Sequence, residues 1–182
     1  VGNVGIAHTR WATHGKPSEK NAHPHLDTSR GIALVHNGII ENYALLKMDL
    51  EKKGIVFRSD TDSEVIVHLL RESIQVGMSF EEAFRLTLGK LKGTYGIAVV
   101  NQAEPERLLV ARMGSPLVIG VGKDEWFVAS DVSPLLPHTR RVVYLEDGEY
   151  AVLTPDGYTV HARGKISKKE VVDVEWSETE AK

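Results

Sequence analysis

The hydrophobic pattern of this chain changes its period near Gly93, and that change limits the folds open to it. Before Gly93, apolar residues recur at helical spacing in three stretches, within residues 39–53, 65–74 and 83–91. After it come short segments rich in β-formers, separated by turn signals such as Asp147-Gly148. Closely spaced strands favour antiparallel hairpins. The chain is therefore predicted to be α+β, an antiparallel double sheet with helices packed outside it.

The individual elements follow from the same patterns. The strands predicted after Gly93 are Thr94–Asn101, Arg107–Met113, Leu117–Val121, Trp126–Ser130, Arg141–Glu146, Glu149–Thr154 and Gly157–Ala162, with a one-turn helix or loop at Ser130–His138. Before it, strands are predicted at Val4–His8, Gly31–His36 and Ile55–Arg58. The second of these should stop at Asn37-Gly38, a strong turn signal. Capping-box spacing at Thr61–Glu64 and Ser79–Glu82 predicts two helix starts.

Length and charge exclude several classes of protein. With 182 residues the chain can form one good-sized domain but not two full ones. The formal charge of −3 and the lack of a basic run argue against binding to nucleic acid or to an anionic membrane. No apolar stretch approaches a membrane span and no signal peptide is visible, which indicates the cytoplasm. There is no cysteine, so disulfides, thiolate metal sites and a cysteine nucleophile are excluded within the sequence. Because it begins at Val1 rather than Met, we interpret it as a piece of a longer protein.

The stretch from Gly5 to His25 carries an unusual density of polar and aromatic groups. Arg10 offers a planar fork of donors that matches a carboxylate. The loop that follows it adds Trp11 as a possible cover and Thr13 and His14 as hydrogen-bonding groups. Together these residues suit a small anion such as an amino-acid carboxylate, although an exposed Arg–Trp stack with scattered surface histidines would give the same pattern.

Two further motifs allow a functional and a structural interpretation. Asn37-Gly38 is either an ordinary hairpin turn or a pair of amide donors able to form an oxyanion hole. Asp60, Asp62 and Glu64 are either a helix start, a carboxylate site for a metal or nucleotide sugar, or, for Asp62 alone, a partner for a substrate ammonium.

The histidines give little support to a metal centre. His8, His14, His23 and His25 lack the compact helical spacing of zinc hydrolases, and no carboxylate lies close to them in sequence. No metal and no cofactor are predicted.

Several of these segments together resemble a known family. They are Gly-Ile-Ala-His-Thr-Arg-Trp-Ala-Thr-His-Gly (residues 5–15), Asn-Ala-His-Pro-His (21–25), Val-His-Asn-Gly-Ile-Ile-Glu-Asn-Tyr (35–43) and Ser-Asp-Thr-Asp-Ser-Glu-Val (59–65). Leu-Lys-Gly-Thr-Tyr-Gly (91–96), Ala-Arg-Met-Gly-Ser-Pro-Leu (111–117) and Ala-Ser-Asp (129–131) agree with them. The chain is similar over nearly its whole length to the glutaminase domains of glucosamine-6-phosphate synthases, which are class II glutamine amidotransferases.

The resemblance implies a fold and a reaction. The fold would be the four-layer αββα sandwich of N-terminal-nucleophile hydrolases, here without its first strands. The reaction would be hydrolysis of L-glutamine, with the ammonia passed to fructose 6-phosphate on a sugar isomerase domain of the full-length homodimer. We expect residues 1–164 to be a partial glutaminase domain. The charged residues 165–182, with an edge strand at Val171–Trp176, would begin the linker to the isomerase domain.

The resemblance also assigns roles to residues. Arg10 would hold the glutamine α-carboxylate, Asp62 would hold its ammonium group, and His23 would line the site. Asn37 and Gly38 would form the oxyanion hole. The loop that closes over glutamine would contain Trp11, Thr13 and His14.

The nucleophile of the family is an N-terminal cysteine, which this sequence does not contain. The chain alone is therefore predicted to be inactive, and its unpaired sheet edges are predicted to recruit other chains. Two alternatives stay open: a non-catalytic glutamine-binding or regulatory module, and a metal enzyme that uses Asp60 and Asp62.

Overall fold

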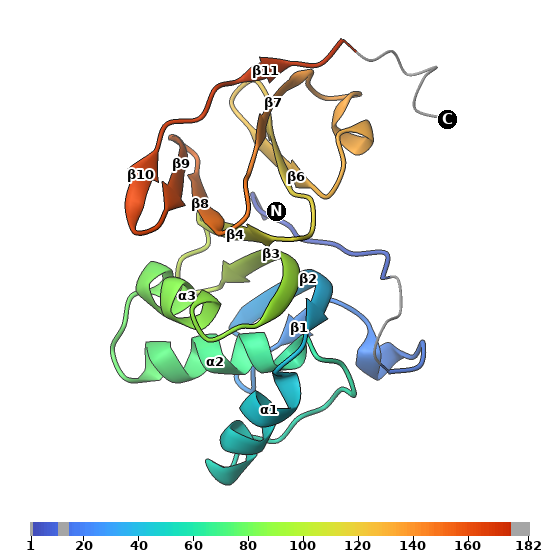
Figure 1. The fold of residues 1–182 in the computed structure, drawn as a ribbon, viewed down its shortest axis with the longest axis vertical. Helices are drawn as coiled ribbons and strands as arrows, with labels where there is room; N and C mark the ends of the chain where they lie inside the picture. Colours follow the sequence, from blue (N-terminus) through green and yellow to red (C-terminus); the bar gives the residue numbers. More distant parts are fainter. Residues whose placement is uncertain (1, 11–14, 176–182) are drawn as a thin grey trace.

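The computed structural model describes residues 2–10 and 15–175, and its elements form two sheets and a helical layer (Figure 1). The helices are η1 (Glu19–Asn21), α1 (Tyr43–Lys52), α2 (Glu64–Gln75), α3 (Phe80–Leu88) and η2 (Ser133–Leu135). The strands are β1 (His25–Leu26), β2 (Ile32–Ile40), β3 (Gly93–Asn101), β4 (Leu108–Met113), β5 (Val118–Val121), β6 (Trp126–Ala129), β7 (Arg141–Tyr144), β8 (Glu149–Thr154), β9 (Gly157–Ala162), β10 (Lys165–Ser167) and β11 (Val172–Asp173). None of these helices is long and apolar enough to cross a membrane.

The strands form one large and one small antiparallel sheet. The seven-stranded sheet has the order β1-β2-β3-β4-β8-β9-β10, and the four-stranded sheet has the order β11-β7-β5-β6. The α-helices cover one face of the large sheet, the small sheet packs on its other face, and η2 packs on the outer face of the small sheet. The predicted α+β sandwich is confirmed.

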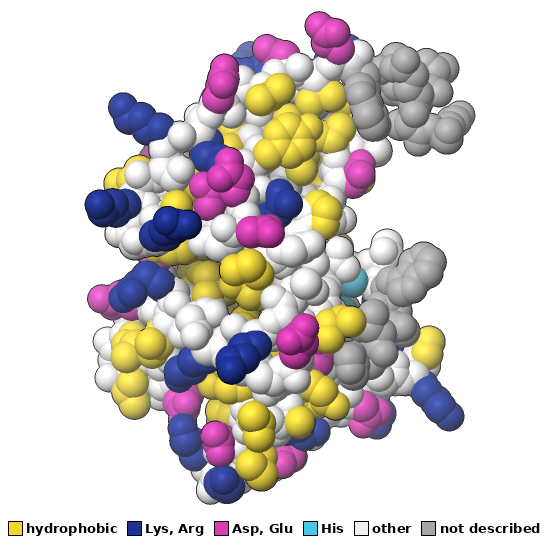
Figure 2. Space-filling view, viewed as in Figure 1, with side chains coloured by type: hydrophobic (Ala, Val, Ile, Leu, Met, Phe, Trp, Pro, Cys, Tyr) yellow, Lys and Arg dark blue, Asp and Glu magenta, His cyan; other side chains and the backbone are white. Residues whose placement is uncertain are grey.

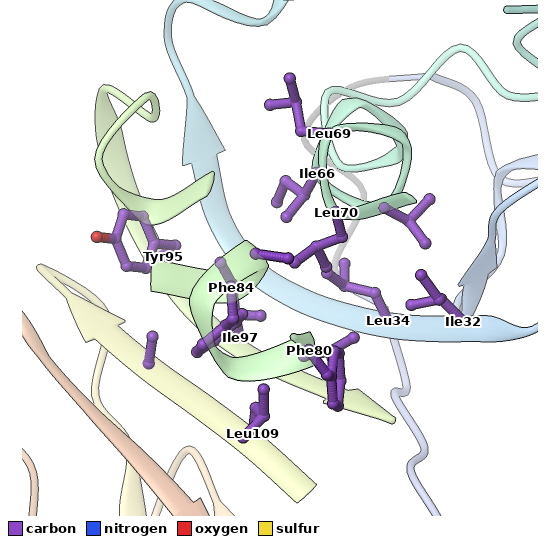
Figure 3. Packing of buried hydrophobic residues seen from close by; sticks show 14 of the residues in the cluster. Ile32, Leu34, Ile66, Leu69, Leu70, Phe80, Phe84, Tyr95, Ile97 and Leu109 are labelled. Carbon is purple, nitrogen blue, oxygen red and sulfur yellow. The ribbon is translucent and has the colours of Figure 1, made fainter. Parts of the chain in front are cut away.

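The core between the helices and the large sheet is built from side chains that are almost fully enclosed (Figure 3). Leu70 of α2 and Phe80 and Phe84 of α3 lie over Leu34 of β2 and Ile97 of β3. None of the five is more than 1% exposed. Burial of one such side chain is worth about 1.5–3 kcal/mol, so this layer fixes the helices on the sheet.

A second core lies between the two sheets. Leu109 of β4 faces the helices, whereas its neighbour Val110 faces the small sheet. There it meets Ile119 of β5 and Val143 of β7, all of them fully buried. Side chains alternate between the faces of a strand, so a strand covered on both sides must be apolar throughout. This explains the uninterrupted apolar runs in the sequence.

Two of the early strands were predicted wrongly. Residues 4–8 form no strand; Val4 and Ala7 are exposed, and only Ile6 packs against the core between the sheets. Residues 55–58 also form no strand. Within the described ranges no strand pairs with either segment, so neither becomes part of a sheet. The N–H groups of Ile55 and Arg58 bond instead to the Leu50 oxygen and to the Glu64 carboxylate.

The end of β2 was also predicted wrongly. Asn37-Gly38 does not turn the chain, because β2 continues to Ile40 and pairs with β3 over its whole length, from Ile32 opposite Asn101 to Ile40 opposite Gly93. The chain turns only after Ile40, before α1.

The two capping-box patterns have different outcomes. Ser79 and Glu82 form the reciprocal bonds of a capping box at α3, as predicted. The prediction at Thr61–Glu64 is wrong: α2 is preceded by Ser63, and no side chain caps it. The carboxylate of Glu64 is buried and binds other groups, which are described below.

The later strands lie close to their predicted positions, and β8 and β9 match them. The expected edge strand is shorter, because β11 covers Val172–Asp173 and pairs with β7, while Trp176 lies outside the described residues. β10 was not predicted, and it pairs with β9 in the large sheet. The division of the chain at residue 164 stays a prediction.

Candidate functional site

A cavity of about 240 Å³ lies where the end of β2 meets the N-terminus of α2. Of the predicted site residues, it is lined by Arg10, His23, Asn37, Gly38 and Asp62. The sequence analysis missed other lining residues, namely His8, His36, Ile39, Thr61, Ser63 and Thr94. Trp11, Thr13 and His14 fall outside the residues that the structure describes. Segments far apart in the sequence thus meet at one pocket.

The outer edge of β2 is open at this pocket. β1 pairs with β2 only at Ala33 and Leu34, so it does not reach Asn37 or Gly38. Backbone N–H groups alternate between the two edges of a strand. Those of Ile32 and Ile40 bond to Asp27 and Asp62, away from β3. Gly38 is an even number of positions from both Ile32 and Ile40, so its N–H points to the same open edge of β2, toward the cavity.

Gly38 occupies a position where a side chain does not fit. Its φ is +134°, a value that L-residues rarely adopt. A Cβ added there would lie 2.2 Å from the backbone oxygen of Thr94 in β3. The hydroxyl of Thr94 also accepts a hydrogen bond from the Ile39 N–H at 3.2 Å. Position 38 requires glycine, because β2 and β3 approach each other closely there.

Asp62 reaches the pocket from the N-terminal side of α2. It is 3% exposed, and its Oδ2 accepts a hydrogen bond from the Ile40 N–H at 2.7 Å. Glu64 shapes the segment before it, since its carboxylate accepts bonds from the backbone N–H groups of Arg58 and Ser59. Burial alone would raise the pKa of Glu64, but these bonds and the one to His68 lower it to about 2.

Arg10 is held by its own loop. Its φ is +55°, and its backbone N–H donates to Nδ1 of His8 at 2.8 Å. Its guanidinium donates to the backbone oxygen of Gly15 at 2.8 Å and also to that of Lys16. Asn21, almost fully buried, donates to the same Lys16 oxygen at 3.0 Å. These contacts fix the base of the loop and place the guanidinium at the cavity.

Three histidine rings contact one another at the pocket, one pair tilted and the other edge to face. The ring of His23 lies 4.4 Å from that of His8 and 4.6 Å from that of His25. Burial, reinforced by the neighbouring histidines, lowers the pKa of His23 to about 3. Burial also lowers the pKa of His25 to about 4, although Glu64 opposes the shift, and it lowers the pKa values of His8 and His36. All four rings are neutral at pH 7.

The pocket therefore carries one positive and one negative charge at neutral pH. Arg10 is the cation, Asp62 is the carboxylate, and the open edge at Asn37-Gly38 lies with them. This arrangement complements a zwitterionic amino acid, whose carboxylate and ammonium groups each meet an opposite charge. The side-chain amide of Asn37 and the N–H of Gly38 can then stabilise negative charge that develops on a third group.

The geometry gives no support to the metal alternative. Within residues 2–10 and 15–175, no three histidine or acidic side chains are placed to hold a metal ion. Asp60 is exposed and forms an ion pair with Lys20 at 2.7 Å, and its neighbour in the motif, Asp62, bonds to the backbone of β2.

The face of the molecule in Figure 2 shows acidic and basic side chains interspersed, with no basic patch outside the grey atoms.

Comparison with known proteins identifies the family to which this chain is similar and the fold that it shares. The family model described as "Glutamine amidotransferase domain" matches residues 8–137. Glutamine–fructose-6-phosphate aminotransferase (isomerizing) of Pyrococcus horikoshii is 51% identical over 178 residues, which is 97% of this chain and 30% of that protein. The enzyme of the same name from Chlorobaculum tepidum is 54% identical over 96% of the chain and 29% of its own length. The chain thus spans less than a third of either relative.

A solved structure is similar over most of the chain. It is glutamine phosphoribosylpyrophosphate amidotransferase from B. subtilis in complex with ADP and GMP. The TM-score is 0.70 at 28% identity, over 85% of this chain and 34% of that one. This likeness confirms the predicted fold class.

Proposed function

The chain belongs to the glutamine amidotransferase domain family, and from this premise we propose that its pocket binds L-glutamine for hydrolysis at the side-chain amide. One observation carries the proposal: Arg10, Asp62 and the Asn37-Gly38 pair, which are far apart in the sequence, line a single small cavity. Arg10 would hold the α-carboxylate and Asp62 the ammonium group. The amide end of the substrate would then lie at the open edge of β2.

Asn37 and Gly38, the oxyanion pair, would act when the side-chain amide carbon of glutamine is attacked. Attack by a thiol turns the amide oxygen into an oxyanion, and two donors fixed in advance stabilise it better than water does. The side-chain amide of Asn37 and the N–H of Gly38 would be those donors. The sequence contains no cysteine, so in this proposal the thiol comes from a part of the polypeptide outside it. We expect the chain alone to release no glutamate.

The remaining predicted roles belong to the same proposal. His23 would line the glutamine site, and the loop over glutamine would include Trp11, Thr13 and His14. The released ammonia would pass to fructose 6-phosphate on a sugar isomerase domain, which residues 165–182 would join. The full-length enzyme would be a cytoplasmic homodimer that makes glucosamine 6-phosphate. Relatives named glutamine–fructose-6-phosphate aminotransferase support this assignment.

A pair of arginine variants tests the proposal in the full-length polypeptide. Arg10→Lys keeps the charge but loses the planar fork, so we expect the KM for glutamine to rise about tenfold or more in an assay of glutamate release. Arg30→Lys is the matched control, because Arg30 also has a left-handed φ, of +60°, but does not line this cavity. Equal KM values for the two variants would contradict the role of Arg10.

The same assay separates the enzyme from a binding module. An enzyme releases glutamate from glutamine, and Asp62→Asn raises its KM because the ammonium group loses its counter-charge. A non-catalytic module binds glutamine in a calorimetric titration but releases no glutamate. A full-length protein that does neither would refute the proposal.

A further inference from the structure

His36 lines the pocket and is almost fully buried. It belongs to β2 and is 3% exposed. Its Nδ1 lies 2.9 Å from Oγ of Ser63, the residue before α2, and its Nε2 lies 3.3 Å from the backbone oxygen of Thr94 in β3. A single imidazole ring therefore links β2, β3 and the N-terminus of α2.

The partners of this ring determine where its proton lies. A backbone oxygen can only accept, so Nε2 must carry the hydrogen that bonds to Thr94. In a neutral ring Nδ1 is then an acceptor, and the hydroxyl of Ser63 donates to it. The acidic group that faces the ring is Asp62, which lies just before α2. The nearby histidines are His8, His23 and His25. Burial lowers the pKa of His36 although Asp62 opposes the shift, so the neutral form persists at pH 7.

The two ends of the His36–Ser63 bond adjoin the two halves of the pocket. Asn37-Gly38 directly follows His36 in β2, and Asp62 directly precedes Ser63. A second bond, from the Ile40 N–H to Oδ2 of Asp62, joins the same two segments at 2.7 Å. The ammonium-binding side and the oxyanion side are thus joined by at least these two bonds, of which the His36–Ser63 bond runs from side chain to side chain.

We infer that His36 is a positioning residue, which acts through Ser63 to fix the Asp62 carboxylate relative to the Asn37-Gly38 pair. The inference rests on the proposed function, because it assigns the spacing of these groups to the recognition of glutamine. The pairing of β2 with β3 runs along the whole length of β2 and does not include this bond. We therefore expect loss of the bond to shift Asp62 and to leave the Asn37-Gly38 pair in place.

Ser63→Ala tests the inference in the full-length polypeptide. A hydrogen bond worth about 0.5–1.5 kcal/mol corresponds to a rise of roughly 2- to 12-fold in the KM for glutamine. We expect kcat to change less than about twofold. The matched control is Ser73→Ala, since Ser73 is equally buried in α2, where its hydroxyl bonds to the Leu69 oxygen far from the pocket. Equal KM values for the two variants would overturn the inference.

Two amide variants of His36 separate its two bonds. In His36→Asn the side-chain oxygen takes the place of Nδ1 and can accept from Ser63. In His36→Gln the amide nitrogen takes the place of Nε2 and donates to Thr94. We expect the KM of His36→Gln to match that of Ser63→Ala and the KM of His36→Asn to stay near the wild-type value.

The double variant completes a mutant cycle. Ser63→Ala with His36→Gln removes the same bond from both ends, so its KM should be no higher than that of either single variant. Additive effects, or equal KM values for His36→Asn and His36→Gln, would show that His36 does not act through Ser63. Circular dichroism of each variant shows whether it is folded, and Ser63→Ala decides the question if the histidine variants do not fold.

A spectroscopic measurement tests the geometry without glutamine. Long-range ¹H–¹⁵N spectra of the chain, with His36→Gln used to assign the ring, should show the neutral tautomer protonated at Nε2 at pH 7. The tautomer protonated at Nδ1 would overturn the inference. A full-length protein that turns over no glutamine refutes the proposed function, whereas an active one with Ser63→Ala equal to Ser73→Ala refutes only the inference.

Discussion

Replacing Gly38 by alanine should destabilise the fold through two separable effects. The first is the backbone angle, because an L-residue at a φ such as +134° costs about 1–2 kcal/mol. The second is the new Cβ, which would lie 2.2 Å from the Thr94 oxygen. That contact cannot be relieved by rotating a side chain, since the oxygen belongs to the backbone of β3. Separating the strands there loses at least one ladder hydrogen bond, about 1 kcal/mol more.

Gly54→Ala isolates the first effect. Gly54 has a φ of +86°, and nothing lies within 4 Å of a Cβ added there. We expect Gly54→Ala to cost about 1 kcal/mol and Gly38→Ala about 2–4 kcal/mol, which for a chain of this size separates their melting temperatures by at least about 2–4 °C. Urea unfolding and calorimetry of the two variants measure the difference. Equal losses would mean that the close approach of β2 and β3 is not a constraint.

Three more predictions concern pH and local bonds. Because His23 and His25 have pKa values of about 3 and 4 in the fold, they take up protons on unfolding below pH 6.5. The free energy of unfolding should therefore fall from pH 6.5 toward pH 4 in urea titrations, and a flat profile would contradict the burial of these two histidines. Asn21→Ala removes the buried amide that accepts from the Asp60 N–H at 2.8 Å, and should lower the free energy of unfolding by about 2–3 kcal/mol. A loss below about 0.5 kcal/mol would show that the other contacts at the base of the loop are sufficient to hold it. Ser79→Ala breaks the capping box of α3 and should cost about 1 kcal/mol by the same measurement; an unchanged midpoint would argue against the cap.

The sequence was most informative where local pattern and burial agree. β8 and β9 match their predicted ranges because the turns around them are set by the residues at the turns themselves. The sequence was misleading where a long-range contact overrides a local signal. Asn37-Gly38 is a turn signal in isolation, but the pairing with β3 extends the strand through it, and glycine is needed there for close approach.

The two capping-box patterns show the same limit. Ser79 and Glu82 are exposed, so only local bonds compete for them, and the prediction is confirmed. Glu64 is buried and bonds instead to the backbone before it and to His68. A sequence window cannot show which of two identical patterns will be enclosed.

The sequence predicted several residues of the candidate site from their chemistry, but it did not predict the hydrogen bonds that connect them. Arg10 and Asp62 were selected because a fork of donors and a carboxylate suit the two charges of an amino acid. His36 and Ser63 gave no such signal. Their bond joins residues 27 positions apart, and its importance depends on what their neighbours do in the fold.

The order of strands in the large sheet has a consequence for how the chain folds. β3 and β4 are close in sequence and pair in the sheet, as do β8, β9 and β10, whereas α1, α2 and α3 lie between β2 and β3 in the chain. β4 and β8 are also neighbours, yet β5, β6 and β7 lie between them in the chain. Nearby strands close small loops and pair quickly, whereas the pairing of β4 with β8 and that of β2 with β3 each require a long one.

We therefore expect the β3–β4 hairpin and the β8–β9–β10 meander to form early and to join late along one seam. The folding of β5, β6 and β7 would bring the hairpin and the meander together. Leu109 and Val152 face each other across this seam. Substitutions at that pair should slow folding, whereas those in β10 should mainly speed unfolding. Formation of the small sheet would then help to set the folding rate, because it brings β4 and β8 together.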